Sequence, residues 1–335
     1  MKQNIIMTDF NPPDTWPFIN TLIKETGQSW TEKRCVSNHL RMSRAENLKR
    51  YWKYFSFSLK IFKDRKQYDI IIAWQQFYGI FIGFFSRLLH VKKMNPLYVM
   101  TFIYIPRSGL VGKLYHSFVK FSINSTYIDK IICFSSKEPD YYSKLFGINT
   151  TKFVYVPLGE DLSFTKKVSS RSRKGVVSLG LSNRDYAFLI RVFKGLEYHL
   201  TIYADHNELV APNITISGEM LGEKVIDILG ESELLVIPLA DKRISAGQLT
   251  VLHAMQLGVP VVATDSDGIR DFIQDGINGY LEENDVEEWR NKIKVLLSDR
   301  DVWKRMSDNT VRIYKKEHTV KSMALNIASI IQDKR

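Results

Sequence analysis

The most informative part of the sequence is residues 236–267, which read VIPLADKRISAGQLTVLHAMQLGVPVVATDSD. The apolar run that ends at Pro238 predicts a buried strand, and a polar loop follows it. Small residues at 245–247 then open a helix that ends at Gly258, and a second strand comes next. A strand, a loop, a helix and another strand form the repeating unit of a parallel sheet with crossover helices.

The same alternation of short β-branched runs and amphipathic segments continues over the whole chain, so we predict an α/β protein. Strands are expected at residues 4–7, 70–73, 97–102, 130–134, 153–156, 176–179, 199–203, 214–216, 234–237, 259–263 and 279–281. A polar, serine-rich stretch separates the two groups of strands and predicts a linker. We place a first domain at residues 1–160, the linker at 161–175, a second domain at 176–315 and a C-terminal helix at 316–335.

The composition excludes a disordered or fibrous chain, because 335 residues with 44% hydrophobic and 25% charged side chains can build ordinary cores. The two cysteines, Cys35 and Cys133, match neither a disulfide framework nor a metal-binding pattern. The first residues lack the apolar segment of a secretory signal. We therefore expect a cytoplasmic protein without a bound metal or other cofactor.

The net positive charge comes from the first half of the chain. Residues 1–150 hold 22 Lys and Arg against 10 Asp and Glu, whereas residues 151–335 hold 25 against 26. A basic half indicates an acidic partner, either nucleic acid or an anionic membrane. No nucleic-acid-binding module is recognisable, which favours the membrane.

Two aromatic stretches lie in the basic half. The charge-free run at 70–86 has two interpretations. It is either a strand followed by a helix packed in the core, which is favoured, or a segment that contacts a membrane. The second stretch, residues 104–121, mixes aromatic side chains with Lys and Arg, which is typical of a protein that lies on a bilayer without crossing it.

Residues 253–281, HAMQLGVPVVATDSDGIRDFIQDGINGYL, resemble the nucleotide-binding domain of GT-B glycosyltransferases, especially the retaining family 4-like enzymes of bacterial exopolysaccharide and capsule biosynthesis. The segments VYVPLGED at 154–161 and VVSLGLSNRDY at 176–186 resemble the strand that enters that domain and its first strand and loop. The resemblance implies two Rossmann-like, doubly wound domains that face a central cleft, with the C-terminal helix packed back on the first domain. The nucleotide-sugar donor would bind to the second domain.

The family's two glutamates, eight positions apart, fall on Ser245 and His253 in this sequence. His253 can still hydrogen-bond a ribose hydroxyl. A helix that starts with small residues can bind a diphosphate through its free N–H groups. The expected donor-binding residues are Gly180, Ser182, Asn183, Arg184, Ser245, Ala246, Gly247, Gln248, Leu249, Thr250 and His253.

Cations must neutralise the diphosphate that leaves during transfer, because the resemblance implies chemistry without a metal. Arg184 falls where the family places such a cation, and its planar guanidinium suits two phosphate oxygens. Arg243, next to Lys242, is the second candidate catalytic cation. Glu160 has two readings, a contact to the donor sugar or an exposed turn. On the acceptor side we single out Asp9, Asn11 and Arg107.

The sequence thus predicts a glycosyltransferase that moves a sugar from a nucleotide donor, expected to be UDP-linked, to a lipid-linked glycan at the inner face of the membrane. Retention of the anomeric configuration is implied by the resemblance alone. Because both family glutamates are replaced, a second interpretation stays open: a non-catalytic, nucleotide-binding or partner-binding subunit of another transferase. Homo-oligomerisation is also left open.

Overall fold

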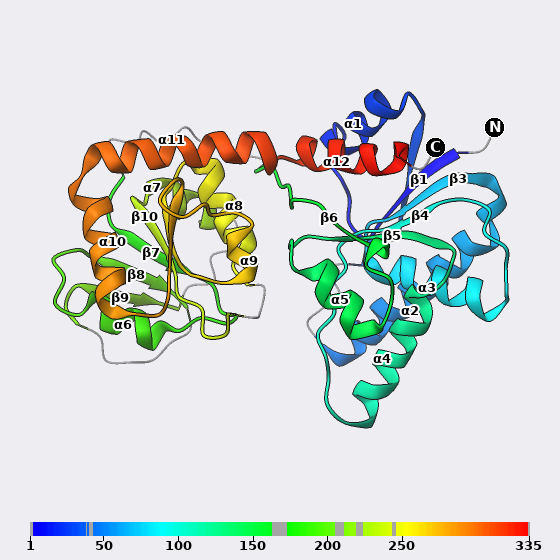
Figure 1. The fold of residues 1–335 in the computed structure, drawn as a ribbon, viewed down its shortest axis with the longest axis horizontal. Helices are drawn as coiled ribbons and strands as arrows, with labels where there is room; N and C mark the ends of the chain where they lie inside the picture. The colour runs from blue at the N-terminus through cyan, green and yellow to red at the C-terminus, as the bar shows by residue number, and fades with distance from the viewer. Residues whose placement is uncertain are drawn as a thin grey trace. The chain divides into compact units, whose positions relative to one another are not determined.

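The computed structural model describes residues 3–37, 39, 43–162, 173–204, 211–218, 224–242 and 246–333. The chain divides into two compact units: unit 1 comprises Met1–Val156 and Met323–Arg335, and unit 2 comprises Pro157–Ser322 (Figure 1). Of the predicted linker, residues 163–172 lie outside the described residues. Each unit is a parallel sheet covered by helices, which confirms the predicted α/β class.

Unit 1 contains six parallel strands in the order β2-β1-β3-β4-β5-β6. The strands are β1 (Gln3–Thr8), β2 (Trp30–Arg34), β3 (Tyr68–Ala73), β4 (Leu97–Val99), β5 (Ile128–Cys133) and β6 (Phe153–Tyr155). The helices are α1 (Pro17–Thr26), α2 (Arg44–Lys63), α3 (Gln76–Leu88), α4 (Gly109–Ile123) and α5 (Glu138–Phe146), with 3-10 turns η1 (Arg65–Gln67) and η2 (Thr150–Lys152). Sequence patterns located every strand here except β2.

The prediction for β4 was too long, since the strand ends at Val99 rather than at residue 102. The chain turns at Thr101, whose φ of 50° lies in the left-handed region. The Thr101 hydroxyl donates to the carbonyl of Trp74 at 2.5 Å and fixes this turn beside the end of β3.

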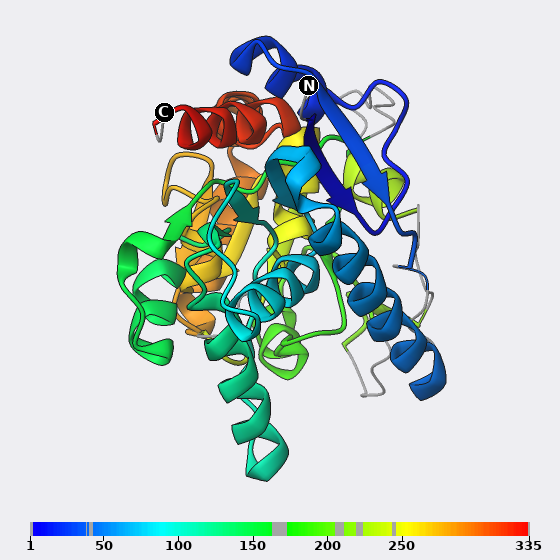
Figure 2. The same ribbon diagram turned by 90° about the vertical axis from the view of Figure 1, so that its right-hand side faces the viewer.

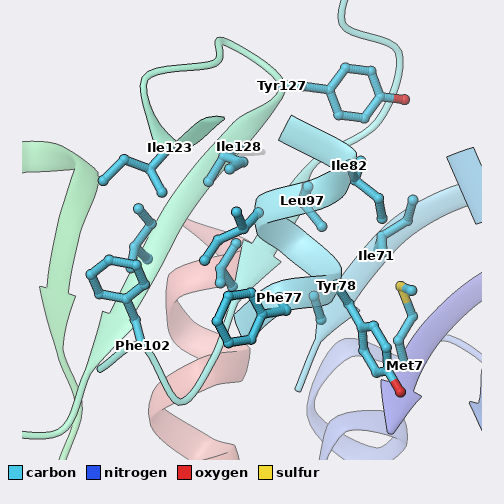
Figure 3. Close-up of a cluster of buried hydrophobic side chains, with 14 of the residues drawn as sticks. Met7, Ile71, Phe77, Tyr78, Ile82, Leu97, Phe102, Ile123, Tyr127 and Ile128 are labelled. Carbon is cyan, nitrogen blue, oxygen red and sulfur yellow. The ribbon is translucent and has the colours of Figure 1, made fainter. Parts of the chain in front are cut away.

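The core of unit 1 is built around α3. Figure 3 shows apolar side chains of β1, β3, β4 and β5 converging on this helix, among them Met7, Ile71 and Ile128. A Cβ atom on Gly79 of α3 would collide with Val99, so this glycine lets the helix lie close against β4. The charge-free run at 70–86 is therefore β3 followed by a buried helix, and the core reading was correct.

The last helix, α12 (Val320–Gln332), packs on unit 1, as the sequence predicted. Its buried face includes Ile327 and Ile331, and the Gln332 amide donates to the carbonyl of Glu25 in α1 at 2.8 Å. None of the helices in the described ranges is long and apolar enough to cross a membrane.

Unit 2 contains six parallel strands in the order β12-β11-β10-β7-β8-β9. The strands are β7 (Val176–Leu179), β8 (Leu200–Tyr203), β9 (Ile214–Ser217), β10 (Leu234–Ile237), β11 (Val261–Thr264) and β12 (Gly279–Glu282). The helices are α6 (Tyr186–Phe193), α7 (Lys224–Glu231), α8 (Gln248–Leu257), α9 (Asp267–Arg270), α10 (Val286–Ser298) and α11 (Arg300–Glu317). Helices α7, α8 and α9 share one apolar cluster with the sheet, and α6 and α10 share another, so both faces are covered.

Each sheet has one point where the order of the strands reverses. In unit 1 the reversal lies between β1 and β3, and in unit 2 it lies between β7 and β10. Doubly wound sheets bind ligands outside the carboxyl ends of the two strands at such a point, because the following loops diverge to opposite faces there. The loops after β7 and β10 are therefore the place to look for a site in unit 2.

Candidate functional site

Arg184 lies where the loops after β7 and β10 meet. A Cβ atom built on Gly180 would lie 2.9 Å from its Nη2, and one built on Gly247 would lie 3.2 Å from the same nitrogen. The Arg184 Nε donates to the carbonyl of Leu179 at 3.1 Å, and Nη1 donates to the carbonyl of Ser182 at 2.9 Å. The guanidinium is thus held by backbone oxygens beside two glycines, 67 positions apart in the sequence.

Within the described parts of the chain, Arg184 forms no hydrogen bond to a carboxylate, and Tyr186 is the ionisable group that influences its pKa. Burial lowers the pKa of the Arg184 guanidinium from its usual value, and Tyr186 partly opposes this effect. The side chain nevertheless stays charged, because arginine does not deprotonate in proteins. A half-buried cation whose hydrogen bonds to the described residues go only to carbonyl oxygens attracts an anion strongly.

The helix α8 begins next to this cation. Its N-cap is Gly247, with a φ of 85°, and no side chain in the described ranges caps the free N–H groups of its first turn. The first turn carries no acidic residue either. A helix N-terminus has a partial positive charge and free N–H donors, both of which favour a phosphate group. The structure thus brings Arg184, Gly180, Gly247 and the start of α8 together.

Asn183 fastens the two loops to each other. Its side-chain amide donates to the carbonyl of Asp241 at 2.7 Å and accepts from the Asp241 N–H at 2.8 Å. Its φ of 56° places it in the left-handed region, which asparagine tolerates. Asn183 was predicted to bind the donor, but its amide hydrogen-bonds the loop after β10. It therefore helps to position the neighbouring Arg184.

His253 and Glu160 meet on the other side of α8. The His253 Nε2 lies 3.9 Å from Glu160 Oε1 and is buried without a hydrogen-bond partner among the described residues. The main chain of Glu160 is fixed by α11: its N–H donates to the carbonyl of His318 at 3.1 Å, and its carbonyl accepts from the Tyr314 hydroxyl at 2.8 Å. A carboxylate thus lies beside the position where the resemblance expects a glutamate.

The remaining predicted donor residues differ in placement. Ser182 and Leu249 are exposed, whereas Ala246, Gln248 and Thr250 are partly buried around the start of α8. The Gln248 amide donates to the carbonyl of Gly268 at 3.4 Å. Arg243 and Ser245 lie outside the described residues.

Lys242, the neighbour of Arg243, forms an ion pair with Glu283 in the segment after β12. Its charge is thus matched by a carboxylate, in contrast to that of Arg184.

Sequence patterns missed a network that holds the ends of three strands. The Thr264 hydroxyl accepts from the Leu239 N–H at 2.8 Å and donates to Asn284 Oδ1 at 2.7 Å. The Asn284 amide in turn donates to the carbonyl of Leu239 at 3.0 Å. Thr264 stood in the quoted motif, but its partner Asn284 could be recognised only from the strand order.

The acceptor-side residues of unit 1 are not gathered into one cluster. Asp9 follows β1, is buried, and accepts from the Tyr54 hydroxyl at 3.1 Å. Asn11 is exposed in the next loop. Arg107 is exposed before α4, and its guanidinium lies 4.8 Å from the centre of the Tyr115 ring.

In the comparison with known proteins, a family model matches part of unit 2. Residues 177–299 match the model described as Glycosyl transferases group 1. Sulfoquinovosyl transferase SQD2 of Arabidopsis thaliana is 34% identical over 89 residues, which are 25% of this chain and 17% of that protein. Alpha-D-kanosaminyltransferase of Streptomyces kanamyceticus is 25% identical over 121 residues, 36% of this chain and 31% of that protein. The chain thus spans less than a third of either relative.

Solved structures match over almost the whole chain. Anabaena HepE in complex with UDP-glucose has a TM-score of 0.63 at 13% identity, with 99% of this chain and 100% of that chain covered. Sucrose-phosphate synthase of Thermosynechococcus elongatus has a TM-score of 0.67 at 12% identity, with 99% of each chain covered.

The chain has the GT-B fold. The predicted fold is therefore confirmed. The residues that match the family model, 177–299, belong to unit 2.

Proposed function

We propose that this chain is a glycosyltransferase that moves a sugar from a UDP-linked donor to a lipid-linked glycan of a bacterial surface polysaccharide. The observation that carries the proposal is the placement of Arg184 against Gly180 and Gly247 at the N-terminus of α8. It lies at the strand reversal of the unit that matches the group 1 model. The choice of UDP is supported by HepE, whose structures hold UDP-glucose or UDP.

The site suits the departure of a nucleoside diphosphate. Cleavage of the bond between the sugar and the diphosphate leaves a negative charge on the β-phosphate oxygens. Arg184 and the free N–H groups of α8 would stabilise that charge as it develops. We propose that the transfer needs no metal ion, because these groups supply the positive charge themselves.

The remaining assignments extend this proposal. His253 would hold a ribose hydroxyl, because its buried Nε2 has no partner among the described residues. We place the acceptor on unit 1, whose basic character suits a lipid pyrophosphate, and the protein at the inner face of the membrane as a peripheral protein. Retention of configuration is proposed from the resemblance to family 4-like enzymes.

A second candidate function is a subunit that binds nucleotide without catalysis. Ser245 and His253 stand where the family carries glutamates, which favours this alternative. The proximity of Glu160 to His253 favours the enzyme, because it restores one carboxylate beside α8. Release of UDP from UDP-sugars, with a membrane fraction as the source of acceptor, separates the two. An enzyme would release UDP over many cycles, whereas a binding subunit would bind the UDP-sugar without releasing UDP.

Calorimetric titration with UDP in EDTA tests the donor site directly. The Arg184→Ala variant should bind UDP more weakly by about 1 to 3 kcal/mol, the scale of a lost charge-assisted hydrogen bond. Arg312→Ala is the matched control, since Arg312 is an exposed arginine of the same unit, on α11. Equal affinity of the wild type and the Arg184→Ala variant would remove Arg184 from the site, and a requirement for added metal would contradict the proposed mechanism.

A further inference from the structure

Unit 1 exposes large apolar side chains at the first turns of α4. Leu110, Val111 and Leu114 are 79%, 71% and 72% exposed, and Ile105 in the preceding loop is also exposed. In both views of the molecule, the start of α4 extends beyond the other elements of unit 1 (Figures 1 and 2). Exposure of apolar side chains to water costs free energy. In folded proteins, a large exposed apolar patch usually marks an interaction site.

A second apolar surface lies on the first half of α2. Leu48 is 73% exposed and Trp52 is 66% exposed. They border an open hollow of about 620 Å³ that is lined by Ala45, Leu48, Lys49, Tyr51, Trp52 and Phe55.

The two surfaces belong to one edge of unit 1. Helices α2 and α4 both pack on α3: the Tyr51 ring lies 5.0 Å from that of Phe77, and the Phe118 ring lies 5.9 Å from that of Phe81. Tyr51 and Tyr115 lie near enough to influence each other electrostatically. Both helices begin at the same, lower end of unit 1 (Figures 1 and 2). We call this edge the α2–α4 surface, made of residues 44–55 and 105–115.

Positive charge surrounds the apolar side chains. Residues 44–128 hold fourteen Lys and Arg against three Asp and Glu. Six of these cations belong to the α2–α4 surface: Arg44, Lys49, Arg50, Lys53, Arg107 and Lys113. A surface of this kind gains both from apolar burial at the headgroup boundary and from attraction to anionic lipid.

We propose that the α2–α4 surface docks on a bilayer that contains anionic phospholipid. Leu110, Val111 and Leu114 would enter the boundary between headgroups and acyl chains, Trp52 would lie at the same level, and the surrounding cations would face lipid phosphates. A second copy of the chain fits this surface less well, because a two-fold contact would place one basic patch against the other. The proposal rests on the membrane placement proposed above, but it does not depend on sugar transfer.

The test uses the full chain and vesicles of phosphatidylcholine, alone or with phosphatidylglycerol. We expect sedimentation with the anionic vesicles at low salt and release as the salt concentration rises, because exposed charges are screened. The triple variant Leu110→Ser, Val111→Ser, Leu114→Ser should bind these vesicles at least about tenfold more weakly. The matched control, Ile277→Ser with Val295→Ser, alters exposed apolar residues of unit 2 and should bind as the wild type does.

Two further readouts keep the outcomes distinct. Brominated lipid should quench tryptophan fluorescence in the wild type, and less so in Trp52→Phe. UDP titration of the triple variant should match the wild type, so a loss of vesicle binding there is a failure of docking alone. Unchanged vesicle binding by the triple variant, or equal binding to neutral and anionic vesicles, would overturn the proposal. The proposal would also be overturned if sedimentation velocity showed a dimer of the wild type and of the control variant but a monomer of the triple variant.

Discussion

The two strand reversals share one topology but present different chemistry. After β7 and β10 in unit 2, glycines expose the backbone, and Arg184 is held there by carbonyl oxygens. After β1 and β3 in unit 1, aromatic rings fill the corresponding place. The Trp74 ring lies 4.9 Å from that of Phe18 and 5.0 Å from that of Trp16.

The charged side chain also differs between the two reversals. Unit 1 carries the carboxylate of Asp9, which accepts from the Tyr54 hydroxyl, whereas unit 2 carries a cation. A doubly wound sheet thus fixes where a site can form, while the side chains of the loops decide its chemistry. Mutations at the two reversals should therefore have separable effects on stability and on nucleotide binding.

Trp74→Ala should have the largest effect, and it should be confined to unit 1. Removing a ring that packs on three other aromatic side chains costs about 3 kcal/mol of unfolding free energy. Hydrogen exchange measured by mass spectrometry should show faster exchange in peptides of unit 1 only, with UDP affinity unchanged. Trp52→Ala is the control, because that ring is exposed. Faster exchange in unit 2 would contradict this separation.

Gly247→Val should abolish the binding of UDP while both units stay folded. The φ of 85° disfavours any other residue, and a Cβ atom would lie 3.3 Å from Ile237 Cγ2 as well as close to Arg184. We expect a loss of at least about a hundredfold, roughly 2.7 kcal/mol, by calorimetry. Gly218→Val is the matched control, because a Cβ atom there meets no atom of the described residues within 4 Å. Normal UDP binding by Gly247→Val would show that the loop does not hold the phosphates.

Tyr54 should make unit 1 sensitive to alkali. Burial and the Asp9 carboxylate raise the pKa of Tyr54 to about 12, above the usual 10. Because the folded state favours the protonated phenol, this stabilisation is complete below pH 10 and is lost as the pH rises through 12. The wild type should lose up to about 2 kcal/mol more than Tyr54→Phe over that interval. Urea unfolding at each pH measures the free energy of unfolding of both proteins. If the two free energies fell in parallel as the pH rose, Tyr54 would be excluded as the cause.

Glu160→Gln should have the smallest effect. The 3.9 Å pair with His253 is partly exposed, and such pairs contribute less than about 1 kcal/mol. We expect UDP affinity to fall by about twofold to fivefold, measured against Glu231→Gln, an exposed glutamate of α7. A loss as large as that of Arg184→Ala would mean that Glu160 contacts the nucleotide itself.

Most of the sheets could be predicted because buried parallel strands are local apolar runs bounded by turns. The missed strand β2, WTEKR, lies at the edge of its sheet and has only one buried residue, Trp30. Such a segment becomes a strand by pairing with β1, and no local pattern records that pairing. For the same reason, the length of β4 was misjudged, since its end depends on a turn held by the carbonyl of Trp74.

The sequence by itself determined the α/β class, the GT-B resemblance and the stretch at 236–281 that contains the candidate site loop, because these follow from residues that are neighbours in the chain. Only the tertiary structure decided which side chains meet. Arg184 reaches Gly247 and Asn183 reaches Asp241 because the strand order places their loops at one edge of the sheet. Glu160 reaches His253 of α8 because hydrogen bonds to His318 and Tyr314 hold its main chain. Burial and electrostatics depend on distance in space, which the chain acquires when it folds.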